Sequence, residues 1–124
     1  MVERSRLQRE EGVIELRLDT RQDGTWAILE VAGEVDLFTA PSLRERIVQL
    51  IEEGNRQILV DLTQVGFMDS SGLGVLVAGI KRAREAGGDM SLVCREGPTL
   101  KVLAITGLDR VFPIYASVDD AVGS

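Results

Sequence analysis

The order of hydrophobic patterns along the chain constrains the fold more than any other feature. Residues 41–51 carry apolar side chains at helical spacing, residues 57–62 form a nearly continuous apolar run, and residues 73–85 return to helical spacing. A strand-like run at 90–94 and a short helical segment at 98–104 follow. A continuous apolar run suits a central strand covered on both faces, and strands that alternate with helices form parallel units. The order therefore predicts an α/β fold.

The beginning of the domain has a different pattern. Residues 13–18 and 26–32 have strand-like patterns and are separated by the turn-rich segment 19–25, which predicts an antiparallel hairpin. Near the other end, residues 111–115 suit a short edge strand, and Ser117 is placed to cap a terminal helix. The expected fold is a small mixed β-sheet, in which the antiparallel hairpin precedes parallel βα units, with about four helices.

Each of the two longer helical segments is expected to bury one apolar stripe. Thr39 is placed to cap the first of them, and Gly54 ends its pattern. The predicted buried stripes are Leu43, Ile47, Leu50 and Ile51 in the first helix and Leu73, Leu76, Val77 and Ile80 in the second.

Length and composition indicate one soluble domain. The chain has 124 residues, close to the commonest domain size, and shows no internal repeat or linker. Residues 1–12 are expected to form a flexible tail and residues 13–124 a single domain. Neither a signal-peptide pattern nor an apolar stretch of membrane-spanning length is present, and a single cysteine cannot form an internal disulfide. We therefore expect a cytoplasmic protein.

The charge and the missing residue types exclude several functions. The formal net charge of −6 argues against nucleic-acid and membrane partners, which require clustered lysine and arginine. The sequence contains no histidine, which removes Ser-His-Asp and Cys-His catalysis and every zinc site that uses histidine. Its one cysteine, Cys94, is expected to be a small core residue. We expect neither an enzyme nor a bound metal or cofactor, although the sequence leaves weak nucleotide binding open.

The segment Asp69-Ser-Ser-Gly-Leu-Gly74, where a loop meets the second helix, is hard to explain as scaffolding. Gly72, Gly74 and Gly79 each forgo about 1 kcal/mol of helix stability relative to alanine. One explanation is structural: small residues let the helix lie close to a strand, and Asp69 or Ser70 serves only as an N-cap. The other is functional: an exposed serine at a helix N-terminus, without bulky neighbours after it, can enter another protein's active site.

Phosphorylation suits a serine in that position. A phosphoserine adds about −1.5 to −2 charges, which the N–H groups and dipole of a helix N-terminus tolerate. A partner packed against the same surface would have to desolvate this charge near Asp69 and Asp36. The position therefore predicts a switch in binding and not in folding. Other motifs do not fit, because Val77 breaks a dinucleotide fingerprint and Met68 breaks a nucleophile elbow around Ser70.

Two stretches together resemble a known family. Gly33-Glu-Val-Asp36, an apolar strand, and Asp61-Leu-Thr-Gln-Val-Gly-Phe-Met-Asp-Ser-Ser-Gly-Leu-Gly-Val75 closely resemble the STAS-domain anti-sigma factor antagonists of bacteria. Thr106-Gly-Leu-Asp-Arg-Val-Phe-Pro-Ile114 is similar to the C-terminal part of that family. The resemblance covers residues 13 to 122 approximately.

The resemblance implies a mechanism. The unphosphorylated protein would bind an anti-sigma factor that is also a serine kinase of the histidine-kinase-like ATPase fold, and so free its sigma factor. The kinase would phosphorylate Ser70 and end the interaction, and a PP2C-type serine phosphatase would restore the active form. The protein would be a substrate and not an enzyme. The alternative is a non-phosphorylated STAS module that is an accessory of a transporter or of a stress-signalling complex.

The same resemblance implies the site residues. Ser70 is the expected phosphorylation site, and Ser71 remains a physical alternative. Because a decisive switch requires a change in partner affinity of about 10⁴-fold, the hydroxyl of Ser70 is expected to lie inside the partner interface. The expected partner-binding residues are Gly33, Glu34, Asp36, Met68, Asp69, Ser71, Gly72, Leu73 and Gly74.

Overall fold

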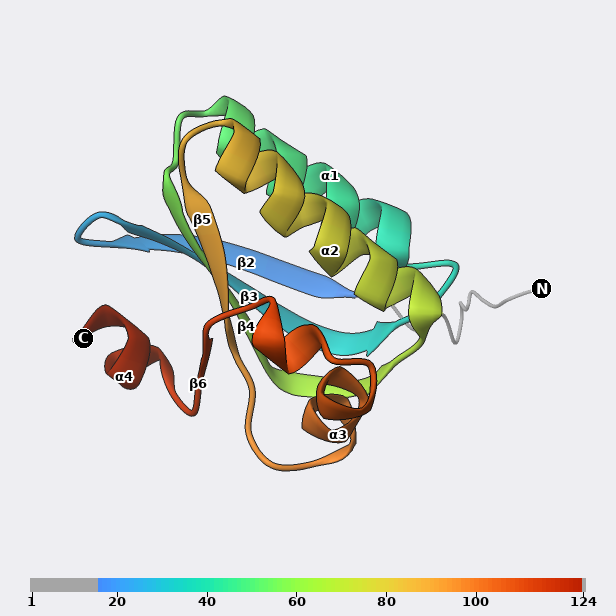
Figure 1. Cartoon of the computed structure of the whole chain (residues 1–124). Helices are drawn as coiled ribbons and strands as arrows, with labels where there is room; N and C mark the ends of the chain where they lie inside the picture. Colours follow the sequence, from blue (N-terminus) through green and yellow to red (C-terminus); the bar gives the residue numbers. More distant parts are fainter. Residues whose placement is uncertain (1–15, 124) are drawn as a thin grey trace.

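A five-stranded mixed sheet forms the centre of the computed structural model, which describes residues 16–123 (Figure 1). The strands follow one another across the sheet in the order β2-β3-β4-β5-β6. The strands are β2 (Arg17–Asp23), β3 (Trp26–Val35), β4 (Gln57–Met68), β5 (Asp89–Val93) and β6 (Ile114–Tyr115). The helices are α1 (Ala40–Glu52), α2 (Ser70–Glu85), α3 (Pro98–Ile105), the 3-10 turn η1 (Leu108–Arg110) and α4 (Val118–Val122).

The topology confirms the expected fold class. Strands β2 and β3 are antiparallel, and each of the other neighbouring pairs, from β3–β4 to β5–β6, is parallel. The helical segments predicted at residues 41–51 and 98–104 form α1 and α3, and Gly54 follows α1 with a φ of 96°. The expected tail at residues 1–12 and the first three residues of the expected strand at 13–18 lie outside the described residues.

Two segments predicted as loops are strands. Residues 19–23 of the predicted turn-rich segment belong to β2, because the hairpin pairs continuously from Arg17 with Ala32 to Asp23 with Trp26. The loop between β2 and β3 consists of Gly24 and Thr25 alone. Gly24 takes the left-handed backbone that a tight hairpin turn requires.

The loop expected between the apolar run at 57–62 and the second helix is also mostly strand, since β4 continues to Met68. This part of β4 pairs with β3 as far as Val35, but the register shifts between Glu30 and Ala32 and again between Gly33 and Glu34. Register shifts interrupt the strict alternation of buried and exposed side chains. The alternation that identifies a strand is therefore interrupted in this part of β4.

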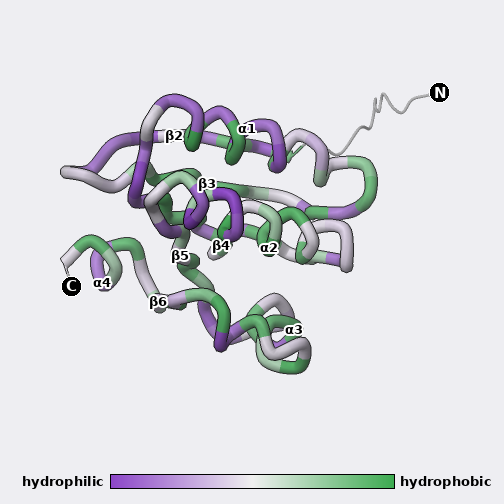
Figure 2. The backbone as a smooth tube through the Cα atoms, turned by 45° about the horizontal axis from the view of Figure 1, so that its top comes forward, coloured by the Kyte–Doolittle hydropathy of each residue, from purple (hydrophilic) through white to green (hydrophobic). Residues whose placement is uncertain are grey.

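Helices α1 and α2 lie side by side over one face of the sheet (Figure 1), and hydrophobic and hydrophilic residues alternate along both of them (Figure 2). The stripe predicted for α1 is buried throughout. In α2, Leu76 and Ile80 are buried and Leu73 is half-buried, but Val77 is 39% exposed, contrary to the prediction. The buried face of α2 instead includes Gly79, where an added Cβ atom would stand 3.1 Å from Cε of Met90 and 3.2 Å from Cγ2 of Ile47.

The opposite face of the sheet is covered at one end by α4, where Ile28, Leu59, Val93 and Ala121 form a second, smaller cluster. Ser117 caps α4 as predicted, since its hydroxyl accepts the N–H of Asp120 at 3.0 Å. Strand β6 is shorter than the predicted strand at 111–115.

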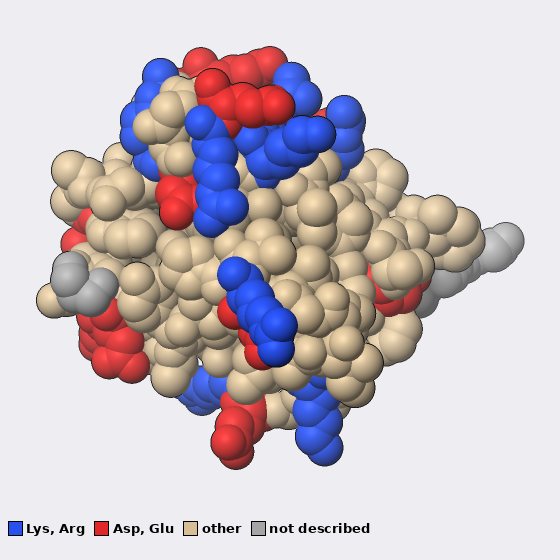
Figure 3. Space-filling model, viewed as in Figure 1, with Lys and Arg blue, Asp and Glu red and all other residues tan. Residues whose placement is uncertain are grey.

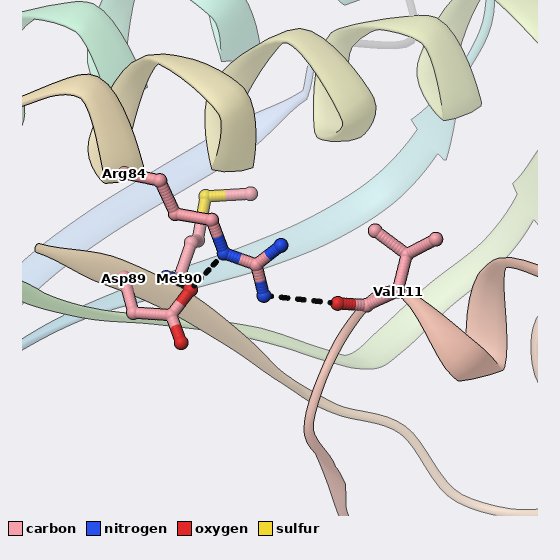
Figure 4. Close-up of polar contacts among 4 residues, drawn as sticks. All are labelled: Arg84, Asp89, Met90 and Val111. Atoms are coloured by element: carbon pink, nitrogen blue, oxygen red, sulfur yellow. Dashed lines mark hydrogen bonds and ion pairs between the residues drawn. The ribbon is translucent and has the colours of Figure 1, made fainter.

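Arg84 connects the end of α2 to two other segments (Figure 4). Its Nε atom lies 2.9 Å from Oδ1 of Asp89, the first residue of β5, and its Nη2 donates to the carbonyl oxygen of Val111 at 3.1 Å. The same Asp89 oxygen accepts the N–H of Met90. These bonds fix the far end of α2, while its N-terminal end carries the candidate site.

Candidate functional site

Helix α2 begins at the predicted phosphorylation site. Asp69 is the N-cap residue, and its Oδ1 accepts the N–H groups of Ser71 at 2.8 Å and of Gly72 at 3.3 Å. Ser70 is the first helical residue, and it is exposed. Because the carboxylate of Asp69 already occupies two of the N–H groups that a helix N-terminus leaves free, the hydroxyl of Ser70 is not needed as a cap.

The two neighbouring serines differ in accessibility. Ser70 is exposed, whereas Ser71 is half-buried one position further into the helix. Ser70 is therefore the more accessible of the two residues to another protein.

The loop between β3 and α1 is fixed by hydrogen bonds within itself. Oδ1 of Asp36 accepts the N–H groups of Phe38 at 2.9 Å and of Thr39 at 3.0 Å. The hydroxyl of Thr39 accepts the N–H of Asp36 at 3.0 Å and donates to the carbonyl oxygen of Glu34 at 2.7 Å. Thr39 is thus the N-cap residue of α1 by position, as predicted, but its hydroxyl turns back to the loop. Gly33, with a φ of 119°, has a backbone that other residues rarely adopt.

The β3–α1 loop and the start of α2 lie next to each other at one end of the molecule (Figure 1). The backbone N–H of Asp69 donates to the carbonyl oxygen of Val35 at 3.0 Å, and Val35 is paired with Met68 in the sheet. The structure therefore brings together the two sequence segments from which the site was predicted.

The predicted site residues divide into a surface and a support. Glu34, Ser70 and Gly74 are exposed, and Gly33, Asp36, Asp69, Ser71 and Leu73 are partly buried. Met68 is 5% exposed and Gly72 is buried, so these two lie beneath the surface. A Cβ atom on Gly72 would stand 2.6 Å from Cγ of Met68 and 2.7 Å from Cγ1 of Val35. Close packing thus accounts for Gly72.

The same structural explanation does not extend to Gly74. A Cβ atom there would meet no atom of the described residues within 4 Å, apart from its chain neighbours and the backbone of its own helix. Glycine at this position therefore gives up helix stability without a packing reason among residues 16–123.

Sequence analysis missed three exposed apolar side chains near the site. Phe38 is 87% exposed and Leu37 is 68% exposed, both in the β3–α1 loop, and Phe67 near the end of β4 is 49% exposed. The pair Leu37 and Phe38 lies between Asp36 and Thr39, in a loop that has neither helical nor strand periodicity. Its one signal in the sequence is that surface loops are usually polar, whereas these two residues are hydrophobic.

A groove of about 210 Å³ runs between α1 and α2, lined in part by Arg44, Lys81 and Arg82. None of its lining residues belongs to the candidate site, and its volume is below the range of about 300–1,000 Å³ that is usual for small-molecule sites.

Within residues 16–123, no cluster of three or more acidic, cysteine or histidine side chains is arranged to hold a metal ion. Among the helices described, none is both long and apolar enough to span a membrane.

The sequence model of the STAS domain family matches residues 17–121 of this chain. The chain belongs to the STAS-domain family. The match includes all five described strands and both segments of the candidate site.

Relatives of this STAS domain are named as regulators of sigma factors. The anti-sigma-B factor antagonist of Bacillus subtilis is 34% identical over 107 residues, which cover 86% of this chain and 97% of that protein. The crystal structure of an anti-sigma factor antagonist from Mycobacterium paratuberculosis has a TM-score of 0.82 at 29% identity, covering 88% of this chain and 92% of that one.

A more distant neighbour is the cell fate determinant SpoIIAA of Bacillus, solved in a phosphorylated form. It has a TM-score of 0.66 at 24% identity and covers 87% of this chain and 96% of that one. At this identity the likeness shows a shared fold.

Proposed function

We propose that this STAS domain is an anti-sigma factor antagonist that is switched by phosphorylation of Ser70. Unphosphorylated, it binds an anti-sigma factor that is also a serine kinase of the histidine-kinase-like ATPase fold, and the sigma factor is released. Phosphorylation ends this interaction, and a PP2C-type serine phosphatase removes the phosphate and restores binding. The names of the relatives support the antagonist role, and the kinase, the phosphatase and the cytoplasmic location are parts of the proposal.

One observation carries the proposal: Ser70 is exposed at the start of α2, while Asp69 takes over the capping of that helix. A phosphate on Ser70 therefore breaks no hydrogen bond on which α2 depends. SpoIIAA, which has the same fold, exists in a phosphorylated form, so a phosphate is compatible with this fold.

The energetic demand on the switch is large. Changing the occupancy of the partner from 99:1 to 1:99 requires a change in affinity of about 10⁴-fold, or ~5.5 kcal/mol. An added dianion supplies this only where water is excluded from it, because exposed charges interact weakly. The hydroxyl of Ser70 is therefore proposed to lie inside the interface, close to the carboxylates of Asp69 and Asp36.

The test combines phosphorylation with binding. The protein is incubated with ATP and with each purified host anti-sigma factor that has a histidine-kinase-like ATPase domain, and phosphopeptides are mapped by mass spectrometry. We expect phosphate on Ser70, its loss in Ser70→Ala, and stable kinase binding by that variant. Ser71→Ala is the matched control and should still be phosphorylated. If no such kinase phosphorylates or binds the protein, the non-phosphorylated accessory module becomes the better explanation.

A further inference from the structure

Two consecutive apolar side chains project from the β3–α1 loop. Phe38 is 87% exposed and Leu37 is 68% exposed. Figure 2 shows a hydrophobic stretch in this loop, just before the start of α1. Isolated apolar residues are common on protein surfaces, but an adjacent pair with this exposure beside a candidate site is a feature of binding surfaces.

The pair is held in place before any partner arrives. The N–H of Phe38 is bound by the Asp36 carboxylate, and the next N–H, that of Thr39, is bound by the same oxygen. The Thr39 hydroxyl closes the loop through its bonds to the N–H of Asp36 and the carbonyl oxygen of Glu34. A rigid loop loses little conformational entropy when it binds, so an exposed side chain on it is a preorganised anchor.

The pair lies at the same end of the molecule as Ser70. The bond between the N–H of Asp69 and the carbonyl oxygen of Val35 joins the two segments, and Figures 1 and 2 show them together at that end from two directions. In Figure 3, lysine and arginine side chains gather at the top of the view, over the helix pair. The right-hand end, where the loop and the start of α2 lie, is mostly uncharged, with acidic side chains at its lower margin.

We propose that Leu37 and Phe38 are the apolar anchors that dock the anti-sigma factor kinase, and that Asp36 and Thr39 are positioning residues that present them. The inference rests on the proposed function, because it assigns the contacts of the same site. The partner surface is an apolar pocket beside the kinase's catalytic centre, since the enzyme that modifies Ser70 must already cover this end.

A second copy of the chain fits the pair less well. Fully burying an aromatic side chain removes about 150–250 Å² from water, whereas a stable protein complex buries about 1,600 Å² in total. The loop alone is therefore too small for a dimer interface. A kinase that holds Ser70 in its active site gains the remaining area around that residue.

The position of the anchors also explains how one phosphate has a large effect. Apolar contacts exclude water from the neighbouring part of an interface. A phosphate on Ser70 would then be brought beside desolvated apolar groups and the Asp69 carboxylate, where no solvent compensates its charge. The anchors provide affinity in the unphosphorylated state and the dry surroundings that make the phosphorylated state unfavourable.

The first test is affinity for the purified kinase that phosphorylates Ser70, measured by calorimetry with ADP present. Phe38→Ala should weaken binding at least about 30-fold and Leu37→Ala about 10-fold, as is usual for residues that dominate an interface. Ile105→Ala is the matched control, because Ile105 is 83% exposed but lies on α3. It should bind like the unsubstituted protein.

The second test separates contact from positioning. Thr39→Val removes the hydroxyl that closes the loop and should weaken binding, while Thr39→Ser keeps the hydroxyl and should restore it. Asp36→Ala removes the acceptor of the N–H groups of Phe38 and Thr39 and should weaken binding, while Asp36→Asn keeps an oxygen that can accept them and should retain more of it. A loss of binding in Asp36→Asn as large as that in Asp36→Ala, at unchanged unfolding temperature, would make the charge of Asp36 a direct contact and overturn its positioning role.

The outcomes distinguish this inference from the proposed function. If the unsubstituted protein binds the kinase and Phe38→Ala and Leu37→Ala bind equally well, the anchors are wrong and the proposed function stands. If binding is unchanged but Phe38→Ala turns a dimer into a monomer in sedimentation, the pair belongs to self-association and the inference is overturned. If the unsubstituted protein binds no such kinase, both proposals fail together.

Discussion

The backbone N–H of Asp69 donates to the carbonyl oxygen of Val35 at 3.0 Å, and this bond fixes the start of α2 against the end of β3. Two segments separated by more than thirty residues in the sequence thereby form one surface. One of them carries Ser70, and the other carries the hydrogen-bonded turn at Asp36. Because both are attached to buried strands, their relative position is set by the core and not by the loops themselves.

The cap at Asp69 gives the first prediction. Asp69→Ala removes the acceptor for the N–H groups of Ser71 and Gly72 and should lower the free energy of unfolding by about 1 kcal/mol, within a range of 0.5–2 kcal/mol. Asp69→Asn keeps a side-chain oxygen and should recover most of this loss. Urea titration followed by circular dichroism measures both. Equal stability of Asp69→Ala and the unsubstituted protein would show that the cap does not stabilise α2.

The glycines of α2 give the second prediction, because they have different surroundings. Gly72→Ala places a Cβ atom against Met68 and Val35, and overpacking of about 1–3 kcal/mol should exceed the gain of about 1 kcal/mol in helix propensity. Gly74→Ala meets open space and should stabilise the protein by up to about 1 kcal/mol. The two substitutions therefore shift the unfolding transition in opposite directions.

Gly74 should also matter for binding of the kinase. Since Gly74 has no packing role within the described residues, we expect Gly74→Ala to weaken kinase binding although it stabilises the fold. Calorimetric titration of the kinase with this variant checks the expectation. Unchanged affinity would mean that the partner does not approach Gly74 closely.

Much of the fold could be predicted from local patterns, because helices and central strands have clear periodicities. The apolar run at 57–62 and the helical stripe of α1 correspond to buried residues in the structure. What could not be predicted depends on contacts between distant segments. Strand β4 continues to Met68 by pairing with β3 across two register shifts. On α2 the buried face includes Gly79, while Val77 is exposed.

In the candidate site, too, local patterns could be predicted and contacts between distant segments could not. Asp69, Ser70 and Gly74 stand out in the sequence, because polar and small residues at the start of an amphipathic helix need a reason. Packing explains Gly72 but does not explain Gly74. This difference depends on where Met68 and Val35 lie relative to α2, which the sequence does not show.

Cys94 gives a prediction about pH. Burial, and to a smaller extent the negative charge of Asp61, raises the pKa of its thiol. The thiolate is the reactive form, so iodoacetamide at pH 8 should alkylate the native protein at least about tenfold more slowly than the urea-unfolded chain. Asp61→Asn should accelerate the native reaction only slightly. Equal rates in the native and unfolded states would contradict the raised pKa.

The same shift predicts a change in stability with pH. Because the pKa of Cys94 is higher in the folded state, its contribution to stability is complete below the pKa of the unfolded chain. The contribution is lost as the pH rises from there through the folded-state pKa, where the native thiol also ionises. Cys94→Ala should therefore lose less stability than the unsubstituted protein in that alkaline range, as denaturant titrations at a series of pH values would show.

Ser70→Asp tests whether the negative charge acts on binding or on folding. The added carboxylate meets the dipole of α2, which favours it, and the carboxylate of Asp69, which opposes it, so the free energy of unfolding should change by less than about 1 kcal/mol. Kinase binding should weaken at least about 100-fold, since the charge must be desolvated in the interface. Ser71→Asp, one residue further into the helix and half-buried, is the matched comparison and should destabilise the fold more. If Ser70→Asp lowered the unfolding temperature as much as Ser71→Asp does, the loss of binding would follow from unfolding, and Ser70 would not be a switch of the surface.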